Sequence, residues 1–215
     1  MIRGVLFDLD GIIVDTLHYH FLAWKHMFEK QGGFVNKQTV LLHEGRKSEE
    51  ILPILIQESG IHIASDRHAR FIEEKRFFYR SIVKIACFPG AFEVVKTLRQ
   101  RGIKVALVTA SALENMQHAL NHEQQACFDL ILTGDETDRA KPFPDLYLTA
   151  AERLRLKPVE CVVVENSPLG IKSAKSAGMY CIAVETTLKR EHLRSADCIL
   201  KSIGELIHNP ILRIS

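Results

Sequence analysis

The sequence lacks the features that mark membrane, secreted, zinc-binding and nucleic-acid-binding proteins. No apolar run approaches the roughly 20 residues that a membrane-spanning helix needs. No signal-peptide pattern precedes the first apolar run, so we expect a cytoplasmic protein with no membrane partner. The chain of 215 residues has a net charge of +2, which gives no reason to expect a nucleic-acid partner. Its five cysteines and ten histidines form no Cys-x-x-Cys or His-Glu-x-x-His motif, which argues against a disulfide framework or a zinc site.

An apolar run that ends in two carboxylates stands out near the start of the chain. The segment from Val5 to Phe7 is typical of a buried strand, and Asp8, Asp10 and Gly11 follow it. Residues two apart on an extended chain point the same way. If the strand continues to Asp10, both carboxylates share one site, and their repulsion calls for a divalent cation or a shared proton. The alternative is a solvated turn, because Asp-Gly favours turns by itself.

Two patterns divide the chain. Helical spacing dominates residues 15–86, whereas strands and helices alternate after Gly90. Alternation predicts a parallel sheet with helices on both faces, and a helical stretch of this length is too long for one crossover. We therefore predict an α/β protein with a Rossmann-like parallel-sheet core (residues 1–14 and 87–215). A helical cap domain (residues 15–86) is inserted after the first strand, where it can act as a lid. The later strands are predicted at residues 103–108, 128–132, 161–164 and 180–184, and a last short helix at 203–208.

Polar side chains follow or flank the predicted core strands. Because the carboxyl ends of parallel strands lie at one edge of a sheet, we expect these side chains to converge. Alone, each has an ordinary explanation: a strand end for Thr109, a surface charge for Lys141, a helix cap for residues 165–167. Together they fit a metal and a phosphate, because oxygens suit Mg²⁺ and hydroxyls, lysines and helix N-termini suit phosphate. The residues are Asp8, Asp10, Thr109, Ala110, Ser111, Lys141, Glu165, Asn166 and Ser167.

In this order, these residues resemble the motifs of the haloacid dehalogenase superfamily, in its phosphatase and phosphomutase branch with a helical cap after the first strand. The likeness covers nearly the whole chain. The segment Asp8-Leu9-Asp10-Gly11 with Asp15 is similar to the first motif, Thr109 to the second, Lys141 to the third, and Glu165-Asn166-Ser167 to the fourth.

The resemblance implies a role for each residue. Asp8 would be the nucleophile that forms an aspartyl-phosphate, and Asp10 the general acid and base. The residues that would hold the phosphoryl group are Thr109, Ala110 and Lys141. The implied ligands of an Mg²⁺ cofactor are Asp8, Asp10 (through its main-chain carbonyl), Glu165 and Asn166. A monomer that acts on a small-molecule phosphate ester is implied as well.

The fourth motif departs from the family pattern. The family usually has Glu-Asp where this chain has Glu165-Asn166. Asn is a neutral oxygen ligand, so the site loses one negative charge. We expect weaker Mg²⁺ binding than with Asp, but not its loss.

The predicted cap carries a second likeness. His20 and Trp24 resemble a stretch of β-phosphoglucomutase in which a cap histidine contacts the acid/base aspartate; sugar-phosphate phosphatases share this stretch. That mutase has an arginine for the far phosphate where this chain has Ser48, and here Arg46 and Lys47 are displaced from that place. A mutase must retain a bisphosphate, so the displacement favours a hydrolase. The predicted substrate residues are His20, Trp24, Arg46, Lys47 and Ser111; the alternative for Arg46 and Lys47 is a solvated pair of loop charges.

The sequence therefore predicts an Mg²⁺-dependent phosphatase of a small phosphorylated metabolite, with a sugar phosphate expected first. β-Phosphoglucomutase, using the same residues, stays as an alternative. A phospho-accepting signalling domain also combines aspartates, magnesium and a lysine, but such domains are small and lack a helical insertion. A purely structural or binding role would follow if Asn166 marked a decayed site.

Overall fold

The central strands are short aliphatic runs. The computed structural model describes residues 1–212, and every residue of Gly4–Phe7 and of Cys161–Glu165 is buried. Continuous apolar runs are typical of parallel strands that helices cover on both sides. Six strands form one parallel sheet in the order β3-β2-β1-β4-β5-β6. Their bounds are β1 Gly4–Phe7, β2 Lys104–Val108, β3 Leu130–Leu132, β4 Cys161–Glu165, β5 Tyr180–Val184 and β6 Cys198–Leu200.

The register of the sheet brings three strand ends level. Phe7 at the end of β1 is paired with Leu107 of β2 and with Val164 of β4. The polar residues Asp8 and Glu165 therefore leave the same edge of the sheet together. The chain also crosses to opposite sides of β1, since β2 lies on one side and β4 on the other. In open α/β sheets, ligands bind in the crevice at such a switch point.

Alternate residues of the strands face two different layers of helices. Phe7 packs in one apolar cluster with Leu98 of α5, whereas Leu6 packs in another with Leu146 of α8 and Ile171 of α9. This alternation follows from the two-residue period of a strand. The core helices are α5 Ala91–Gln100, α6 Leu113–Ala119, α7 His122–Gln125, α8 Asp145–Arg153 and α9 Pro168–Ser176. Short 3₁₀ turns lie at Gly134–Glu136, Pro158–Glu160, Arg190–His192, Ile203–His208 and Pro210–Leu212.

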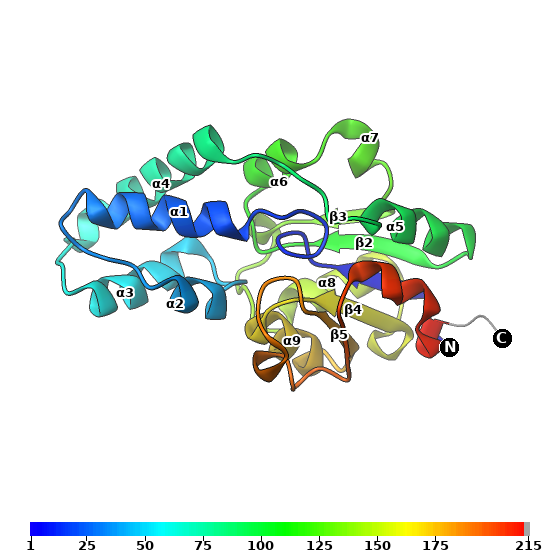
Figure 1. The fold of residues 1–215 in the computed structure, drawn as a ribbon. Coiled ribbons are helices and arrows are strands. Elements are labelled where there is room, and N and C mark those ends of the chain that lie inside the picture. The colour runs from blue at the N-terminus through cyan, green and yellow to red at the C-terminus, as the bar shows by residue number, and fades with distance from the viewer. Residues whose placement is uncertain (213–215) are drawn as a thin grey trace.

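Four helices between β1 and α5 form a second lobe, at the left of Figure 1. The long helix α4 packs against α1 and α3, around an apolar cluster that includes Trp24, Phe28, Leu52 and Phe71. The bounds are α1 Leu17–Glu29, α2 Lys37–Leu42, α3 Ser48–Ser59 and α4 His68–Ile82, with a 3₁₀ turn at Ser65–Arg67. We call this lobe the cap.

The two chain segments that connect the cap to the core run side by side. Val14 and Cys87 form an antiparallel bridge. The amide of Asp15 donates to the carbonyl of Ala86 at 2.8 Å, and the amide of Phe88 donates to the carbonyl of Ile13 at 2.9 Å. The cap therefore leaves and rejoins the core at one point.

The predicted α/β fold with a parallel sheet is confirmed. The first strand ends at Phe7 and does not continue to Asp10. The sequence analysis also missed β6 and α7, which are short, and the predicted helix at 203–208 is a 3₁₀ turn. The division into a cap domain at residues 15–86 and a core domain stays a prediction, and its last residues, 213–215, lie outside the described residues.

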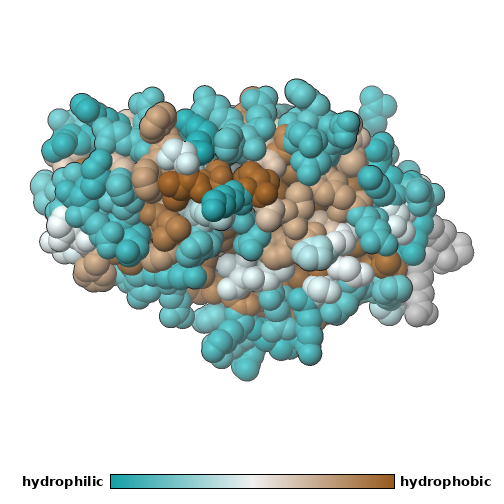
Figure 2. Space-filling model, turned by 45° about the horizontal axis from the view of Figure 1, so that its top comes forward, coloured by the Kyte–Doolittle hydropathy of each residue, from teal (hydrophilic) through white to brown (hydrophobic). Residues whose placement is uncertain are grey.

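Most of the face shown in Figure 2 is hydrophilic, and apolar surface gathers in a band across its middle. Within residues 1–212, no helix has the length and apolar character that crossing a membrane requires.

Candidate active site

The predicted site residues meet at the carboxyl edge of the sheet, below the cap. Contacts link three segments of the core: Asp8 contacts Lys141 at 2.6 Å, and Lys141 contacts Glu165 at 2.7 Å. A second set of contacts links Asp10 to Ser111 at 2.8 Å. The hydroxyl of Thr109 accepts from the amide of Ser111 at 3.0 Å. The structure thus brings together side chains that lie more than 150 residues apart in sequence.

Lys141 is buried between two carboxylates. Its side chain is 1% exposed, and its ammonium group donates to Asp8 Oδ1 and to Glu165 Oε1. Burial alone would lower the pKa of Lys141, but the charges of Asp8 and Glu165 raise it above its usual value. Burial raises the pKa of Asp8 to about 7; Lys141 opposes this rise, and the carboxylates of Glu165 and Asp10 add to it. The lysine therefore stays charged and holds the carboxylate of Asp8 in place.

Both carboxylate oxygens of Glu165 accept hydrogen bonds from other residues of the protein. Oε1 accepts from Lys141 and from the hydroxyl of Tyr147 at 2.8 Å. Oε2 accepts from the backbone amides of Asn166 and Ser167. Burial would raise the pKa of Glu165, but these donors, Lys141 foremost, lower it. The contacts suit a residue that orients Lys141, and its membership of the metal shell stays a prediction.

Asp10 has a different environment. Its Oδ1 accepts from the hydroxyl of Thr16 and lies 3.5 Å from His20 Nε2, while its Oδ2 accepts from Ser111. Burial would raise the pKa of Asp10, but His20, Thr16 and Ser111 together lower it below its usual value. Two carboxyl groups two residues apart are thus held differently, one by a buried ammonium and one by hydroxyls and an imidazole.

A cap lysine that the sequence analysis missed fixes the tautomer of His20. Lys75 of α4 lies 3.1 Å from His20 Nδ1. An ammonium group only donates hydrogen bonds, so Nδ1 accepts and Nε2 carries the proton that faces Asp10. Burial first, and then the charge of Lys75, lower the pKa of His20, which keeps the ring neutral. The ring also stacks on Tyr79 with centroids 4.0 Å apart.

The spacing of α4 contains a signal for Lys75. The buried residues of this helix are Phe71, Ile72, Lys75 and Tyr79, which is the period of one helix face. Lys75 is therefore a cation on an apolar face, with its ammonium 4.8 Å from the ring centre of Trp24. Burial lowers the pKa of Lys75 to about 8. A charged residue on the buried face of a predicted helix was the signal that could have identified it.

The oxygen atoms beside Asp8 fit a magnesium ion. Asn166 Oδ1 is buried and has no hydrogen-bond partner among residues 1–212, and Asp8 uses only Oδ1 in its bond to Lys141. In that part of the chain, no three His, Cys, Asp or Glu side chains gather as a ready-made metal cage. Mg²⁺ does not need one, because it binds through one or two protein carboxylates, waters and substrate phosphates. Asp8 and Asn166 are the residues that would hold it, and the ligand set stays a prediction.

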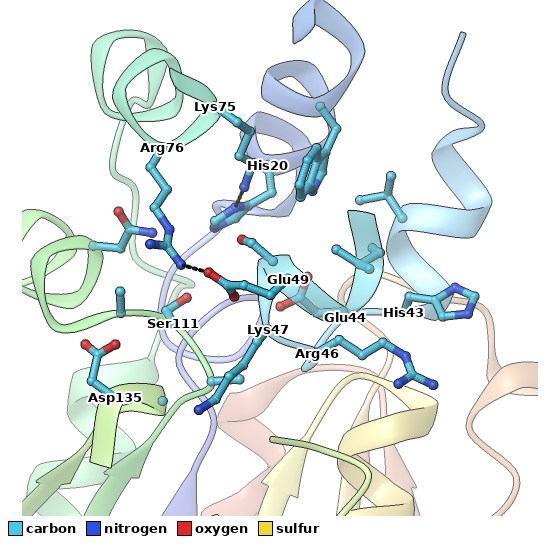
Figure 3. Close-up of a pocket in the computed structure, with 18 residues that line it drawn as sticks. His20, His43, Glu44, Arg46, Lys47, Glu49, Lys75, Arg76, Ser111 and Asp135 are labelled. Carbon is cyan, nitrogen blue, oxygen red and sulfur yellow. Dashed lines mark hydrogen bonds and ion pairs between the residues drawn. The ribbon is translucent and has the colours of Figure 1, made fainter. Parts of the chain in front are cut away.

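A cavity of about 300 Å³ opens between cap and core. Asp8 and Asp10 do not line it, but His20 and Ser111, which both contact Asp10, do. The predicted residues His20, Trp24, Arg46, Lys47, Ala110 and Ser111 line it. Figure 3 shows that Arg46 and Lys47 point in opposite directions. Arg46 lies 3.6 Å from Glu50, and Lys47 donates to the carbonyl of Thr137 in the core at 2.6 Å. Both cations thus have partners within the protein.

One charged pair and one further acid of the cavity were not predicted. Arg76 of α4 lies 3.0 Å from Glu49 of α3, and Figure 3 shows this pair across the upper part of the cavity. Glu44 also lines the cavity. Burial first, and then the carboxylates of Asp10 and Asp8, raise the pKa of Glu44 to about 8. The cavity wall therefore mixes acids, bases and hydroxyls.

Comparison with known proteins agrees with this geometry. A family model described as haloacid dehalogenase-like hydrolase matches residues 5–184. The chain is 32% identical over 185 residues to a phosphorylated carbohydrates phosphatase of Thermotoga maritima, covering 82% of each chain. It is 29% identical over 211 residues to β-phosphoglucomutase of Bacillus subtilis, covering 95% of this chain and 91% of that one. Among solved structures, β-phosphoglucomutase of Clostridium difficile has a TM-score of 0.85 at 27% identity, covering 96% of this chain and 93% of that one.

Proposed function

Since the chain belongs to the haloacid dehalogenase-like hydrolase family and is a phosphoric monoester hydrolase of its phosphatase and β-phosphoglucomutase-like branch, we propose its substrate and chemical route. The substrate is a small phosphorylated metabolite, in the first instance a sugar phosphate. Cleavage depends on Mg²⁺ and passes through an aspartyl-phosphate on Asp8. The enzyme acts as a monomer.

The contrast between Asp8 and Asp10 carries this proposal. Asp8 directly follows β1, and Lys141 fixes its Oδ1, so the carboxylate is presented to phosphorus from a fixed position. Asp10 faces the cavity side, where Ser111 and His20 contact it. A carboxylate held in place suits a nucleophile, and a second carboxyl beside the leaving group suits a general acid and base.

The residues divide two steps between them. In the first, the Asp8 oxygen bonds to phosphorus while the bond to the ester oxygen breaks. Asp10, whose pKa is low without substrate, must be protonated in the substrate complex, and it then gives its proton to that oxygen. In the second, Asp10 takes a proton from water, which attacks the phosphorus and releases Asp8. Lys141 and Thr109 would donate to the phosphoryl oxygens. Positioning and charge neutralisation are the main sources of rate in phosphoryl transfer.

Mg²⁺, held by Asp8 and Asn166, supplies the positive charge that offsets the crowded carboxylates and the phosphate. The neutral amide of Asn166 gives this site one negative charge less than an aspartate would. We therefore keep the expectation that the magnesium requirement is met at a higher concentration than in an Asn166→Asp variant.

The cavity supports a hydroxyl-rich leaving group. Its wall offers donors and acceptors from Ser48, Ser111, Asn115 and Glu44, which match the hydroxyls of a sugar or polyol. Its volume of about 300 Å³ is at the lower end of the usual range for small-molecule sites, which begins near 300 Å³. The Thermotoga relative is named for phosphorylated carbohydrates, which agrees with this choice.

A mutase is the second candidate, because two observations favour it. The chain is similar to two β-phosphoglucomutases along more than nine tenths of its length, and Lys75 places a buried cation at the cavity. Against it, Arg46, Lys47 and Arg76 each have a partner within the protein. A hydrolase remains the better supported reading of the cavity.

Phosphorus NMR separates the two candidates. The protein is mixed with β-glucose 1-phosphate, a trace of the bisphosphate and Mg²⁺, and then with a panel of sugar phosphates. Growth of inorganic phosphate, abolished by Asp8→Asn, supports the phosphatase. Growth of glucose 6-phosphate without inorganic phosphate identifies a mutase. Absence of turnover over the whole panel would contradict the proposed sugar-phosphate substrate.

A further inference from the structure

Three loops at the carboxyl edge of the sheet meet around one amide. Asn166 follows β4, Gly11 follows β1, and Thr187 follows β5. The Asn166 side chain is buried, and its Nδ2 donates to Thr187 Oγ1 at 2.9 Å. Its Oδ1 is the end that has no hydrogen-bond partner in residues 1–212. One end of the amide is thus held while the other stays available to a ligand.

An amide must be held the right way round, whereas a carboxylate need not be. The two ends of an Asn side chain differ: one is an oxygen with lone pairs and the other is an NH₂ donor. Turning the group by half a rotation would place two N–H bonds where a cation should bind. An Asp has an oxygen at both ends, so the same rotation changes nothing. Only the partner of the nitrogen distinguishes the two orientations of Asn166.

The loop that carries Thr187 is fixed against Gly11. A Cβ at position 11 would lie 2.0 Å from Asn166 Nδ2 and 2.8 Å from Thr187 Oγ1. Gly11 has a φ of +90°, which disfavours any other residue there. The neighbouring Thr186 donates its hydroxyl to the Gly11 carbonyl at 2.5 Å. On the other side of Thr187, Leu188 is buried in the apolar cluster that also contains Leu6. The acceptor that faces the amide therefore has a defined position.

We propose that Thr187 is a positioning residue for the magnesium site, an inference that rests on the metal in the proposed function. Its hydroxyl oxygen accepts from Nδ2 of Asn166 and so leaves Oδ1 as the end that can bind the cation. The need for this residue follows from the Asn that replaces the usual Asp of the fourth motif. With an Asp at 166, a hydroxyl at 187 adds little orientation.

Four proteins test this inference through Mn²⁺ binding without substrate: wild type, Thr187→Val, Asn166→Asp, and the double variant. Mn²⁺ prefers the same octahedral oxygen ligands as Mg²⁺, and free Mn²⁺ is counted by electron paramagnetic resonance. Loss of a residue that orients a metal ligand weakens binding roughly 10–100-fold. We expect a loss of about tenfold for Thr187→Val with Asn at 166, and of less than about twofold with Asp at 166, because only the amide has two unlike ends.

Two further proteins serve as controls. Thr187→Ser keeps the hydroxyl and should retain the wild-type Mn²⁺ affinity, which a role in packing alone would not predict. Asp8→Asn defines the binding that does not belong to the site. Thermal unfolding followed by circular dichroism checks that each variant is folded, and the double variant shows whether valine is tolerated at 187.

The outcomes separate this inference from the proposed function. Equal losses for Thr187→Val in both backgrounds, or no loss in either, overturn the role of Thr187 while leaving the metal site in place. If wild type and Asn166→Asp bind no more Mn²⁺ than Asp8→Asn does, the metal site itself is wrong, and the role of Thr187 falls with it. A loss confined to the Asn166 background confirms the inference.

Discussion

Core and cap each bury one lysine, and they treat it in opposite ways. Lys141 of the core is 1% exposed and Lys75 of the cap is 3% exposed. Lys141 lies between two carboxylates, which raise its pKa. Lys75 lies between an imidazole and two aromatic rings, and burial lowers its pKa to about 8. The core neutralises its cation with carboxylates at ion-pair distance, whereas the cap surrounds its cation with an imidazole and aromatic rings.

This difference assigns separate tasks to the two lobes. A cation that is already paired holds a carboxylate in a fixed place and suits chemistry that is the same for every substrate. A cation without a carboxylate at ion-pair distance, as for Lys75 within residues 1–212, costs stability and is retained where it contacts something else. Under the proposed function, the core would hold the transferred phosphoryl group, and the cap would contact the part of the substrate that differs.

The largest expected effect comes from removing the paired cation. Lys141→Met leaves two buried carboxylates without their partner, so the free energy of unfolding should fall by about 3–5 kcal/mol. Turnover should fall by at least roughly 10³-fold, since the cation that the proposed function places on the phosphoryl group is lost. Urea unfolding and phosphate release measure the two effects.

Lys175→Met is the matched control for that variant. Lys175 pairs with Asp197 at the surface, where its side chain is 42% exposed. A change above about 1 kcal/mol is not expected for such a pair. Similar losses in both variants would show that burial between carboxylates is not what makes Lys141 special.

A cavity in the cap core gives the next effect. Leu52 of α3 is fully buried, so Leu52→Ala should lower the free energy of unfolding by about 2–5 kcal/mol. If the cap is a domain of its own, hydrogen exchange should speed up in α1, α3 and α4 before it does in the sheet. Leu98→Ala, at an equally buried position of α5, is the control. It should speed up hydrogen exchange in the sheet. Uniform acceleration in both variants would contradict the predicted boundary at residues 15 and 86.

Replacing Lys75, the cation without a carboxylate at ion-pair distance in residues 1–212, should raise stability, whereas Lys141→Met should lower it. The folded-state pKa of Lys75 is about 8, below its usual 10.5, so the unfolded chain binds more protons between these values and the strain from Lys75 is relieved as pH rises. Lys75→Met should therefore be more stable than wild type at pH 7 by about 1–3 kcal/mol. By pH 9 the difference in stability between Lys75→Met and wild type should be smaller. The KM of Lys75→Met for a sugar phosphate should be higher than that of wild type. A stability gap that does not depend on pH would argue against this account.

The smallest effect should come from the charged pair at the cavity wall. Arg76 and Glu49 are 33% and 55% exposed, and such pairs contribute about 0.2–1 kcal/mol. Glu49→Gln should therefore lower the free energy of unfolding by no more than about 1 kcal/mol, and it should alter KM for a monophosphate by less than about fivefold. With a bisphosphate, KM of the Glu49→Gln variant should fall, because Arg76 without its partner is free to contact the second phosphate. Equal KM changes for both substrate types would show that Arg76 does not face the leaving group.

The sequence was sufficient for the sheet and for most of the core site, because both depend on local patterns. Apolar runs gave the central strands, and the ends of parallel strands must converge, so Asp8, Lys141 and Asn166 could be placed together in advance. The short strand β6 could not, since three half-buried residues leave little periodicity. Contacts between distant segments of the chain were also beyond reach: nothing local shows that Lys75 of α4 meets His20 of α1, 55 residues away in the same lobe. The same holds for Thr187, whose partner lies 21 residues away on another loop.

The paired connection at Val14 and Cys87 has a consequence for how such a protein can change. Bridged residues in an antiparallel pair lie only about 4.5–5.5 Å apart, a gap that a two-residue hairpin turn can close. In topological terms the whole cap is an insertion at the tip of a hairpin, and the strand order of the sheet does not depend on which residues form that insertion. Under the proposed function, an enzyme built this way could exchange the lobe that contacts the leaving group as a single unit, while the lobe that breaks the phosphate ester is inherited unaltered.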